Sequence, residues 1–213
     1  LGDPYALEPN PDASAGALLV LDSAAQDQIG PVDTLLPRPL KATVVDESGR
    51  PVQGAAVRFV LREGTARFHG GALFAEVSTD RFGDARVDLK LGTLLGNFGV
   101  TQRLPGLPEP DFLGLSSIDV TAESARGTLL SGVPYRAFVR AGPASQVLLS
   151  SSNPQDSVLF PGMGPGVNAQ SFADLAVGAA DRFGNRIANV PITLSAEVTG
   201  TDCTLGGVPP TVF

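Results

Sequence analysis

The residues that could do chemistry are few and far apart in this sequence. His69 is the only histidine and Cys203 the only cysteine among the 213 residues. A zinc site takes three or four closely placed ligands, and the nucleophile turn of a serine hydrolase reads G-x-S-x-G, which does not occur here. We therefore expect no enzyme: no catalytic residue, no metal ligand and no cofactor. His69 is interpreted as a loop residue and Cys203 as a small apolar residue of a strand.

Aspartate gives a clearer pattern, Asp-x-x-Gly, which recurs at residues 46–49, 80–83 and 181–184. The carboxylate of the first residue can accept backbone N–H bonds within a turn, and glycine suits the fourth position because it tolerates a positive φ. The pattern predicts structural turns at Asp46, Gly49, Asp80, Gly83, Asp181 and Gly184. Calcium binding is the alternative, but it needs several oxygen ligands at one point, which isolated turns do not supply.

The first turn lies between two stretches that alternate as β-strands do. From residue 40 to 44 and from residue 57 to 61, apolar side chains occupy every second position. A period of two with β-branched and aromatic residues is typical of a half-buried strand. The strands therefore position the turns. Four arginines fall on outward faces and are interpreted as ordinary solvated positions: Arg58, Arg62, Arg86 and Arg136.

An altered copy of residues 40–61 follows at residues 175–196. Asp46 matches Asp181, Gly49 matches Gly184 and Phe59 matches Leu194, each 135 positions later (181 − 46, 184 − 49 and 194 − 59). The repeat predicts an all-β chain with two antiparallel Greek-key sandwiches. We expect a linker or the tail of a preceding module at residues 1–15, the first sandwich at 16–142 and the second at 143–213.

Residues 103–114 (RLPGLPEPDFLG) interrupt the first module. Three prolines and two glycines forbid a continuous ladder there, and a long loop in a compact domain often carries function. The loop is expected to expose Leu104, Leu107, Phe112 and Leu113. It is either packed over the rim of the sandwich or a contact surface for a neighbouring domain or partner.

The second module is predicted to be incomplete, because only residues 197–213 follow its copy of the repeat. Either the chain has been cut, or another chain or a missing segment completes the sandwich by strand addition. The chain starts at Leu1 and not at Met, so we expect that it is processed or excised from a longer polypeptide.

The composition of the chain indicates which classes of partner it does not bind. The net charge is −7 and the pI about 4.6, whereas nucleic acids and anionic membranes attract clustered Lys and Arg. We expect neither as a partner.

No apolar run is long enough to span a bilayer, so no membrane insertion is expected in this segment. With 43% hydrophobic residues the chain can bury real cores, and a single cysteine cannot form an intrachain disulfide.

Three segments together resemble bacterial immunoglobulin-like domains of the invasin and intimin type. They are L-x-A-x-V-x-D-x-x-G-x-P-V-x-G-A-x-V-x-F at residues 40–59, S-T-D-x-x-G-x-A-x-V-x-L-x-L-G at 78–92, and the hinge A-G-P-A-S at 141–145. The resemblance covers most of residues 16–142 and the first half of the second module. It implies tandem immunoglobulin-like sandwiches in an extended stalk, and it supplies no catalytic residues. The insertion at 103–114 and the unfinished second module depart from the pattern.

The resulting hypothesis is a structural or adhesive array at a bacterial cell surface or in a secreted protein. Its partners are neighbouring modules of the same chain, other copies of itself or a surface protein. Two alternatives stay open. The modules are accessory parts of a larger secreted enzyme, or the chain is a filament subunit that assembles by strand addition.

Overall fold

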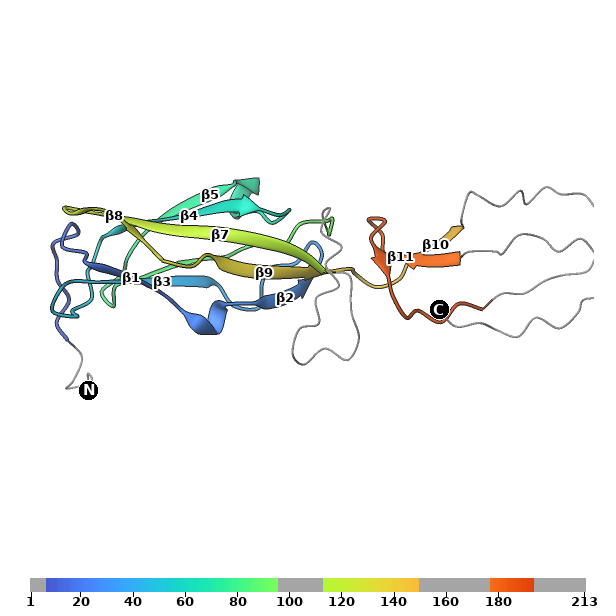
Figure 1. The fold of residues 1–213 in the computed structure, drawn as a ribbon, viewed down its shortest axis with the longest axis horizontal. Helices are drawn as coiled ribbons and strands as arrows, with labels where there is room; N and C mark the ends of the chain where they lie inside the picture. The colour runs from blue at the N-terminus through green and yellow to red at the C-terminus, as the bar shows by residue number, and fades with distance from the viewer. Residues whose placement is uncertain (1–6, 96–112, 150–176, 194–213) are drawn as a thin grey trace, which may run out of the picture. The chain divides into compact units, whose positions relative to one another are not determined.

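The chain folds into β-strands throughout its described parts. This computed structural model describes residues 7–95, 113–149 and 177–193, which contain no α-helix and two short 3-10 turns, η1 (Ser23–Ala25) and η2 (His69–Gly71). The predicted all-β class is confirmed (Figure 1). The chain divides into two compact units, Leu1–Gly142 and Pro143–Phe213. Three residues of the predicted contact loop, Leu104, Leu107 and Phe112, lie outside the described residues, as does Cys203.

The described residues of the first unit form two sheets. One has the order β1 (Leu18–Leu21), β3 (Leu40–Val45), β6 (Asp84–Val87). The other has the order β2 (Gln28–Pro31), β9 (Tyr135–Arg140), β7 (Leu113–Ser124), β4 (Ala56–Glu63), β5 (Phe74–Ser78), and β8 (Gly127–Leu130) also pairs with β7. The β2–β9 pair is parallel, and the other pairs are antiparallel.

This strand order is that of an immunoglobulin-like sandwich. Lettered along the chain, the first sheet is A-B-E and the second is A′-G-F-C-C′, with β8 and β9 as two parts of strand G. The predicted immunoglobulin-like fold is therefore confirmed for the first unit. The parallel β2–β9 pair is a feature that the prediction of antiparallel sheets did not include.

The core lies between the two sheets and follows the predicted alternation. Leu40, Ala42 and Val44 of β3 are at most 1% exposed. Phe59 of β4 is fully buried, and within the six-stranded sheet it pairs with Val120 of β7. Burial of a phenylalanine side chain stabilises a fold by roughly 1.5–3 kcal/mol, so the large residues at these positions hold the sandwich together.

Two local predictions are corrected. The alternation of residues 85–91, with Val87, Leu89 and Leu91 on one face, predicts a strand over that whole range. In the structure β6 ends at Val87, and Lys90 forms isolated bridges with Leu35 and Arg67. The chain changes its pairing partners there, while Leu89 stays fully buried. Leu113 was expected to be exposed in the loop, but it is the first residue of β7 and only 1% exposed.

The second unit repeats the start of the first. Its described strands are β10 (Gln146–Leu149), β11 (Val177–Ala180) and β12 (Arg186–Ile187), paired antiparallel in that order. Ala180 pairs with Arg186, as Val45 pairs with Pro51 in the first unit, and both positions are 135 residues apart (180 − 45 and 186 − 51). The repeat seen in the sequence is therefore a repeat of strand, turn and returning segment. Residues 194–213 lie outside the described residues, so the predicted incompleteness of this module stays a prediction.

Candidate functional site

The three Asp-x-x-Gly segments form turns with one hydrogen-bond pattern. In each, Oδ1 of the aspartate accepts the backbone N–H two and four residues later. The distances are 2.9 and 3.0 Å from Ser48 and Arg50 to Asp46, 2.8 and 3.1 Å from Phe82 and Asp84 to Asp80, and 2.9 and 3.0 Å from Phe183 and Asn185 to Asp181. The glycine N–H also donates to the aspartate carbonyl, at 2.9–3.0 Å. A single carboxylate oxygen thus orders the whole turn.

Glycine is required at the fourth position because the backbone there is left-handed. The φ angles are 79° at Gly49, 73° at Gly83 and 85° at Gly184. Gly83 has a second constraint, since a Cβ added there would lie 2.5 Å from the carbonyl oxygen of Val44. The Gly83 carbonyl accepts the N–H of Val44 at 2.9 Å. The second turn is therefore packed directly against β3.

The first turn is fastened by a residue from the predicted linker. Nδ2 of Asn10 donates to Oδ2 of Asp46 at 2.9 Å, and the guanidinium of Arg50 lies 3.0 Å from the same oxygen. Asn10 also forms a parallel bridge with Val52. Hydrogen bonds from Ser48 and Asn10, followed by those from Arg50, hold the pKa of Asp46 well below its ordinary value. The carboxylate is therefore an ionised acceptor whose second oxygen faces an amide and a cation.

In the third turn, a residue of the turn itself donates a hydrogen bond to the second carboxylate oxygen of the aspartate. Asn185 donates through Nδ2 to Oδ2 of Asp181 at 2.9 Å, and Asp181 is only 1% exposed. The second and third turns share the sequence Asp-Arg-Phe-Gly, and in both the guanidinium lies over the neighbouring ring, 4.6 Å from Phe82 and 4.5 Å from Phe183. Within the described ranges there is no group of three or more His, Cys, Asp or Glu residues that could hold a metal ion.

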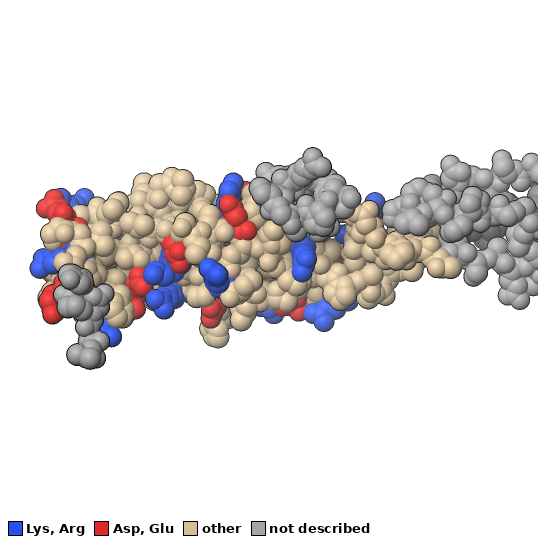
Figure 2. Space-filling model, turned by 90° about the horizontal axis from the view of Figure 1, so that it is seen from below, with Lys and Arg blue, Asp and Glu red and all other residues tan. Residues whose placement is uncertain are grey.

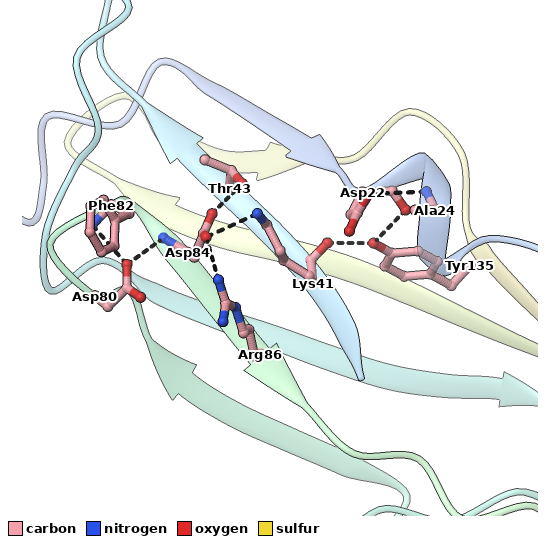
Figure 3. Close-up of polar contacts among 9 residues, drawn as sticks. All are labelled: Asp22, Ala24, Lys41, Thr43, Asp80, Phe82, Asp84, Arg86 and Tyr135. Atoms are coloured by element: carbon pink, nitrogen blue, oxygen red, sulfur yellow. Dashed lines mark hydrogen bonds and ion pairs between the residues drawn. The ribbon is translucent and has the colours of Figure 1, made fainter. Parts of the chain in front are cut away.

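Asp84 is the centre of a second polar cluster, on the outer face of the three-stranded sheet (Figure 3). Its carboxylate accepts a hydrogen bond from Oγ1 of Thr43 at 2.6 Å and lies 3.0 Å from both Nζ of Lys41 and a guanidinium nitrogen of Arg86. Burial by itself would raise the pKa of Asp84, but the hydrogen bond from Thr43 and the pairing with Lys41 and Arg86 outweigh it and hold the pKa below its ordinary value.

Lys41 and Asp84 form an ion pair, with Nζ and the carboxylate oxygen 3.0 Å apart. A lowered pKa keeps the carboxyl of Asp84 ionised, and the cation of Arg86 beside it favours the same state. The arrangement joins β3 to β6 through charge, and Asp84 also links to the second turn through its N–H.

Tyr135 joins the two sheets (Figure 3). It lies at the start of β9, is fully buried, and donates its hydroxyl to the backbone carbonyl of Lys41 in β3, with the carbonyl of Asp22 3.3 Å away. Burial raises the pKa of Tyr135 to about 12, with the two carbonyls opposing that shift. The phenol therefore stays neutral and acts as a fixed donor between the layers.

The four outward arginines are exposed as expected, but each has a contact. Arg58 lies over the ring of Phe74 at 4.7 Å. The others form ion pairs: Arg62 with Asp119 at 2.7 Å, Arg86 with Asp84 at 3.0 Å, and Arg136 with Asp27 at 2.8 Å. Figure 2 shows basic and acidic side chains interspersed along this face of the first unit. His69 is exposed in η2.

Sequence reasoning missed Asn10, Asp84 and Tyr135. Asn10 lies in the segment predicted to be a linker or the tail of a preceding module, and Asp84 directly follows the turn predicted at Asp80 and Gly83. Tyr135 is one of only two tyrosines, which is the signal that could have marked it: a phenol in an alternating strand needs a hydrogen-bond partner when buried.

Comparison with known proteins identifies no family for this chain. No family model matches it, and no curated protein matches it. Among solved structures, surface layer protein SbsC, domains 4–9, is similar with a TM-score of 0.33 and 14% identity over 87% of this chain. The chain spans 23% of that structure's length. In the part of the chain that the structure describes, no helix is long and apolar enough to cross a membrane.

Proposed function

We propose that this chain is a structural part of a bacterial cell-surface or secreted protein, in which immunoglobulin-like sandwiches follow one another and carry load or contact other proteins. The observation that carries the proposal is the repeated strand and aspartate turn, which returns after 135 residues with the same register and the same hydrogen bonds to the carboxylate (181 − 46). A module repeated in series is the usual construction of a stalk.

The use of polar side chains in the first unit supports the same role. Asp46 orders a turn, Asp84 joins two strands, and Tyr135 joins two sheets. Each of these groups forms hydrogen bonds or ion pairs with other residues of the protein, and these contacts stabilise the fold. We propose no catalytic role for them. Partners are expected to be neighbouring modules of the same chain, other copies of the chain or a surface protein.

The location is tested with antibodies raised against the 213-residue chain. Intact, unpermeabilised cells of the source organism should be labelled, or the protein should be found in the culture medium. A protease added outside the cells should remove the surface signal. Labelling that appears only after the cells are lysed would contradict the proposal.

A further inference from the structure

β5 is one of the two edge strands of the six-stranded sheet. It pairs with β4, and Figure 1 shows it at the outer border of the sheet. The opposite edge strand, β2, ends in Pro31, which has no N–H to offer to another strand. Proteins commonly protect an edge with proline, lysine or a β-bulge. β5 contains none of these, because it reads Phe-Ala-Glu-Val-Ser and pairs with β4 in an unbroken register.

Alternate residues of β5 direct their main-chain groups away from β4. The N–H of Leu61 donates to the carbonyl of Leu73 at 2.8 Å, which fixes the hydrogen-bonded positions of this antiparallel pair. Bonded and non-bonded pairs alternate along such a ladder, so the odd-numbered residues of this stretch bond to β4. The groups that point outward belong to three residues: Phe74, Glu76 and Ser78. No loop or turn of the described ranges forms a main-chain hydrogen bond with them.

The side chains at this edge are largely apolar. Leu73 is 53% exposed and Phe74 is 50% exposed. Ala75 and Val77 are half-buried, on the side of the strand that faces the core. A further strand beside β5 would therefore bury apolar surface as well as pair the outward main-chain groups.

Glu76 determines which strand fits. It is exposed and lies opposite Arg58 in the ladder, but the guanidinium of Arg58 lies over the ring of Phe74, 4.7 Å from its centre. If two copies of β5 paired through all three outward residues, Phe74 would face Ser78 and Glu76 would face its own copy. Like charges directly opposite each other destabilise a sheet, whereas opposite charges stabilise it. Glu76 therefore disfavours a second copy of β5 and favours a strand with a basic residue at this position.

We infer that the β5 edge binds an extended segment of another protein by strand addition, with a basic side chain opposite Glu76 and an apolar one opposite Phe74. Main-chain hydrogen bonds supply the affinity in this mode of recognition, and alternate side chains supply the specificity. The inference rests on the proposed role in contacts with other proteins. It adds the surface that makes the contact and the chemistry of the segment that it takes.

The test uses the isotope-labelled full chain and a synthetic peptide, acetyl-Ser-Thr-Val-Arg-Val-Leu-Ser-amide. In antiparallel pairing its arginine lies opposite Glu76 and its leucine opposite Phe74. The peptide should shift the amide signals of the three outward residues and slow their exchange with solvent. Ala75 and Val77 should change less, because they already bond to β4. The same peptide with glutamate in place of arginine should bind roughly five to thirty times more weakly, since attraction becomes repulsion.

Two variants test the role of the carboxylate. Glu76→Gln should weaken binding of the arginine peptide roughly two to five times, the range expected for an exposed ion pair. Glu123→Gln is the matched control, because Glu123 is also exposed but lies on β7, an inner strand of the same sheet. It should bind the peptide as the wild type does.

Equal binding of the two peptides, equal weakening by the two variants, or signal changes away from β5 would overturn the inference. A wild-type dimer in sedimentation, with β5 in its contact, would also overturn it, because the edge would then belong to a second copy. These results are independent of the cellular location, which antibody access measures.

Discussion

Tyr135 in β9 donates its phenolic hydroxyl to the backbone carbonyl of Lys41 in β3, so one buried side chain bonds the two sheets to each other. In Figure 3 the same hydroxyl also lies 3.3 Å from the backbone carbonyl of Asp22, the residue that follows β1. A sandwich without a disulfide is held by its core and by such contacts. The bond therefore matters for the unit as a whole.

Tyr135→Phe keeps the ring and removes the hydroxyl. The carbonyls of Lys41 and Asp22 lose this donor but keep the backbone N–H groups of Asp22 and Ala25. The expected loss is therefore roughly 0.5–1.5 kcal/mol in the free energy of unfolding, the usual net contribution of one hydrogen bond. Urea unfolding followed by circular dichroism measures it. An unchanged unfolding midpoint would show that the bond contributes nothing.

The same residue predicts a loss of stability at high pH. The pKa of Tyr135 is raised from 10.0 to about 12 by burial. Between these values the unfolded state has lost the phenolic proton while the folded state retains it, so stability is complete below pH 10 and falls as the pH rises toward 12. The wild type should lose stability in this window faster than Tyr135→Phe. Parallel pH curves for the two proteins would contradict the prediction.

Asp84 is expected to make the protein less stable as the pH is lowered. Burial opposes its ionisation, but Thr43, Lys41 and Arg86 together hold its pKa below the ordinary value of 3.8. The folded state therefore binds this proton less readily than the unfolded state, and the stability is present above the ordinary pKa and is lost as the pH falls below it. Asp84→Asn should cost roughly 1–2 kcal/mol near neutral pH.

The difference between Asp84→Asn and the wild type should shrink as the pH is lowered through the carboxyl range, because protonation removes the same charge from the wild type. Urea midpoints measured across this range test the prediction. A difference that stays constant down to the acid limit would show that the carboxylate charge is not what Asp84 contributes.

The repeated turns allow a comparison of two glycines. Gly49 and Gly83 both have a positive φ, but a Cβ at Gly49 would meet nothing within 4 Å, whereas one at Gly83 would lie 2.5 Å from the carbonyl oxygen of Val44. Gly49→Ala should cost roughly 1–2 kcal/mol, the price of a left-handed backbone alone. Gly83→Ala should cost clearly more, on the order of 3 kcal/mol or above, since the clash adds to the strain. Equal losses in thermal unfolding would argue against the packing of the second turn on β3.

Two phenylalanines allow the core to be compared with the surface, because one is buried and the other is exposed. Phe59 is fully buried between the sheets, and Phe82 is 55% exposed under the guanidinium of Arg81. Phe59→Ala should cost roughly 3–5 kcal/mol. Phe82→Ala should cost no more than about 1 kcal/mol, the value of an exposed cation–π contact. If calorimetry found the two losses similar, the assignment of the core would be wrong.

The sequence predicts the local features well, because their causes are local. The alternation around Phe59 and the hydrogen bonds of Asp46 within its turn depend on residues a few positions away. The contact of Tyr135 with Lys41 joins residues 94 positions apart, and that of Arg136 with Asp27 joins residues 109 apart. Such contacts depend on which strands become neighbours, and a single sequence does not contain that information.

The incorrect predictions have the same origin. Leu113 follows a proline-rich stretch, and composition predicts it in the loop, but pairing with Arg140 makes it the first residue of β7. Residues 88–91 continue the alternation of β6, yet Lys90 pairs with Leu35 and Arg67 instead of β3. Alternation shows which side chains are buried, here Leu89 and Leu91, but not which strand lies alongside.

The contact between β2 and β9 completes the immunoglobulin-like strand order of the first unit. Nuclear Overhauser effects between backbone protons of isotope-labelled protein test it directly. We expect cross-strand effects between the neighbourhoods of Ile29 and Phe138 in the pattern of a parallel pair, together with antiparallel effects between Phe59 and Val120. Effects that place Ile29 beside β1, or antiparallel to β9, would contradict the account.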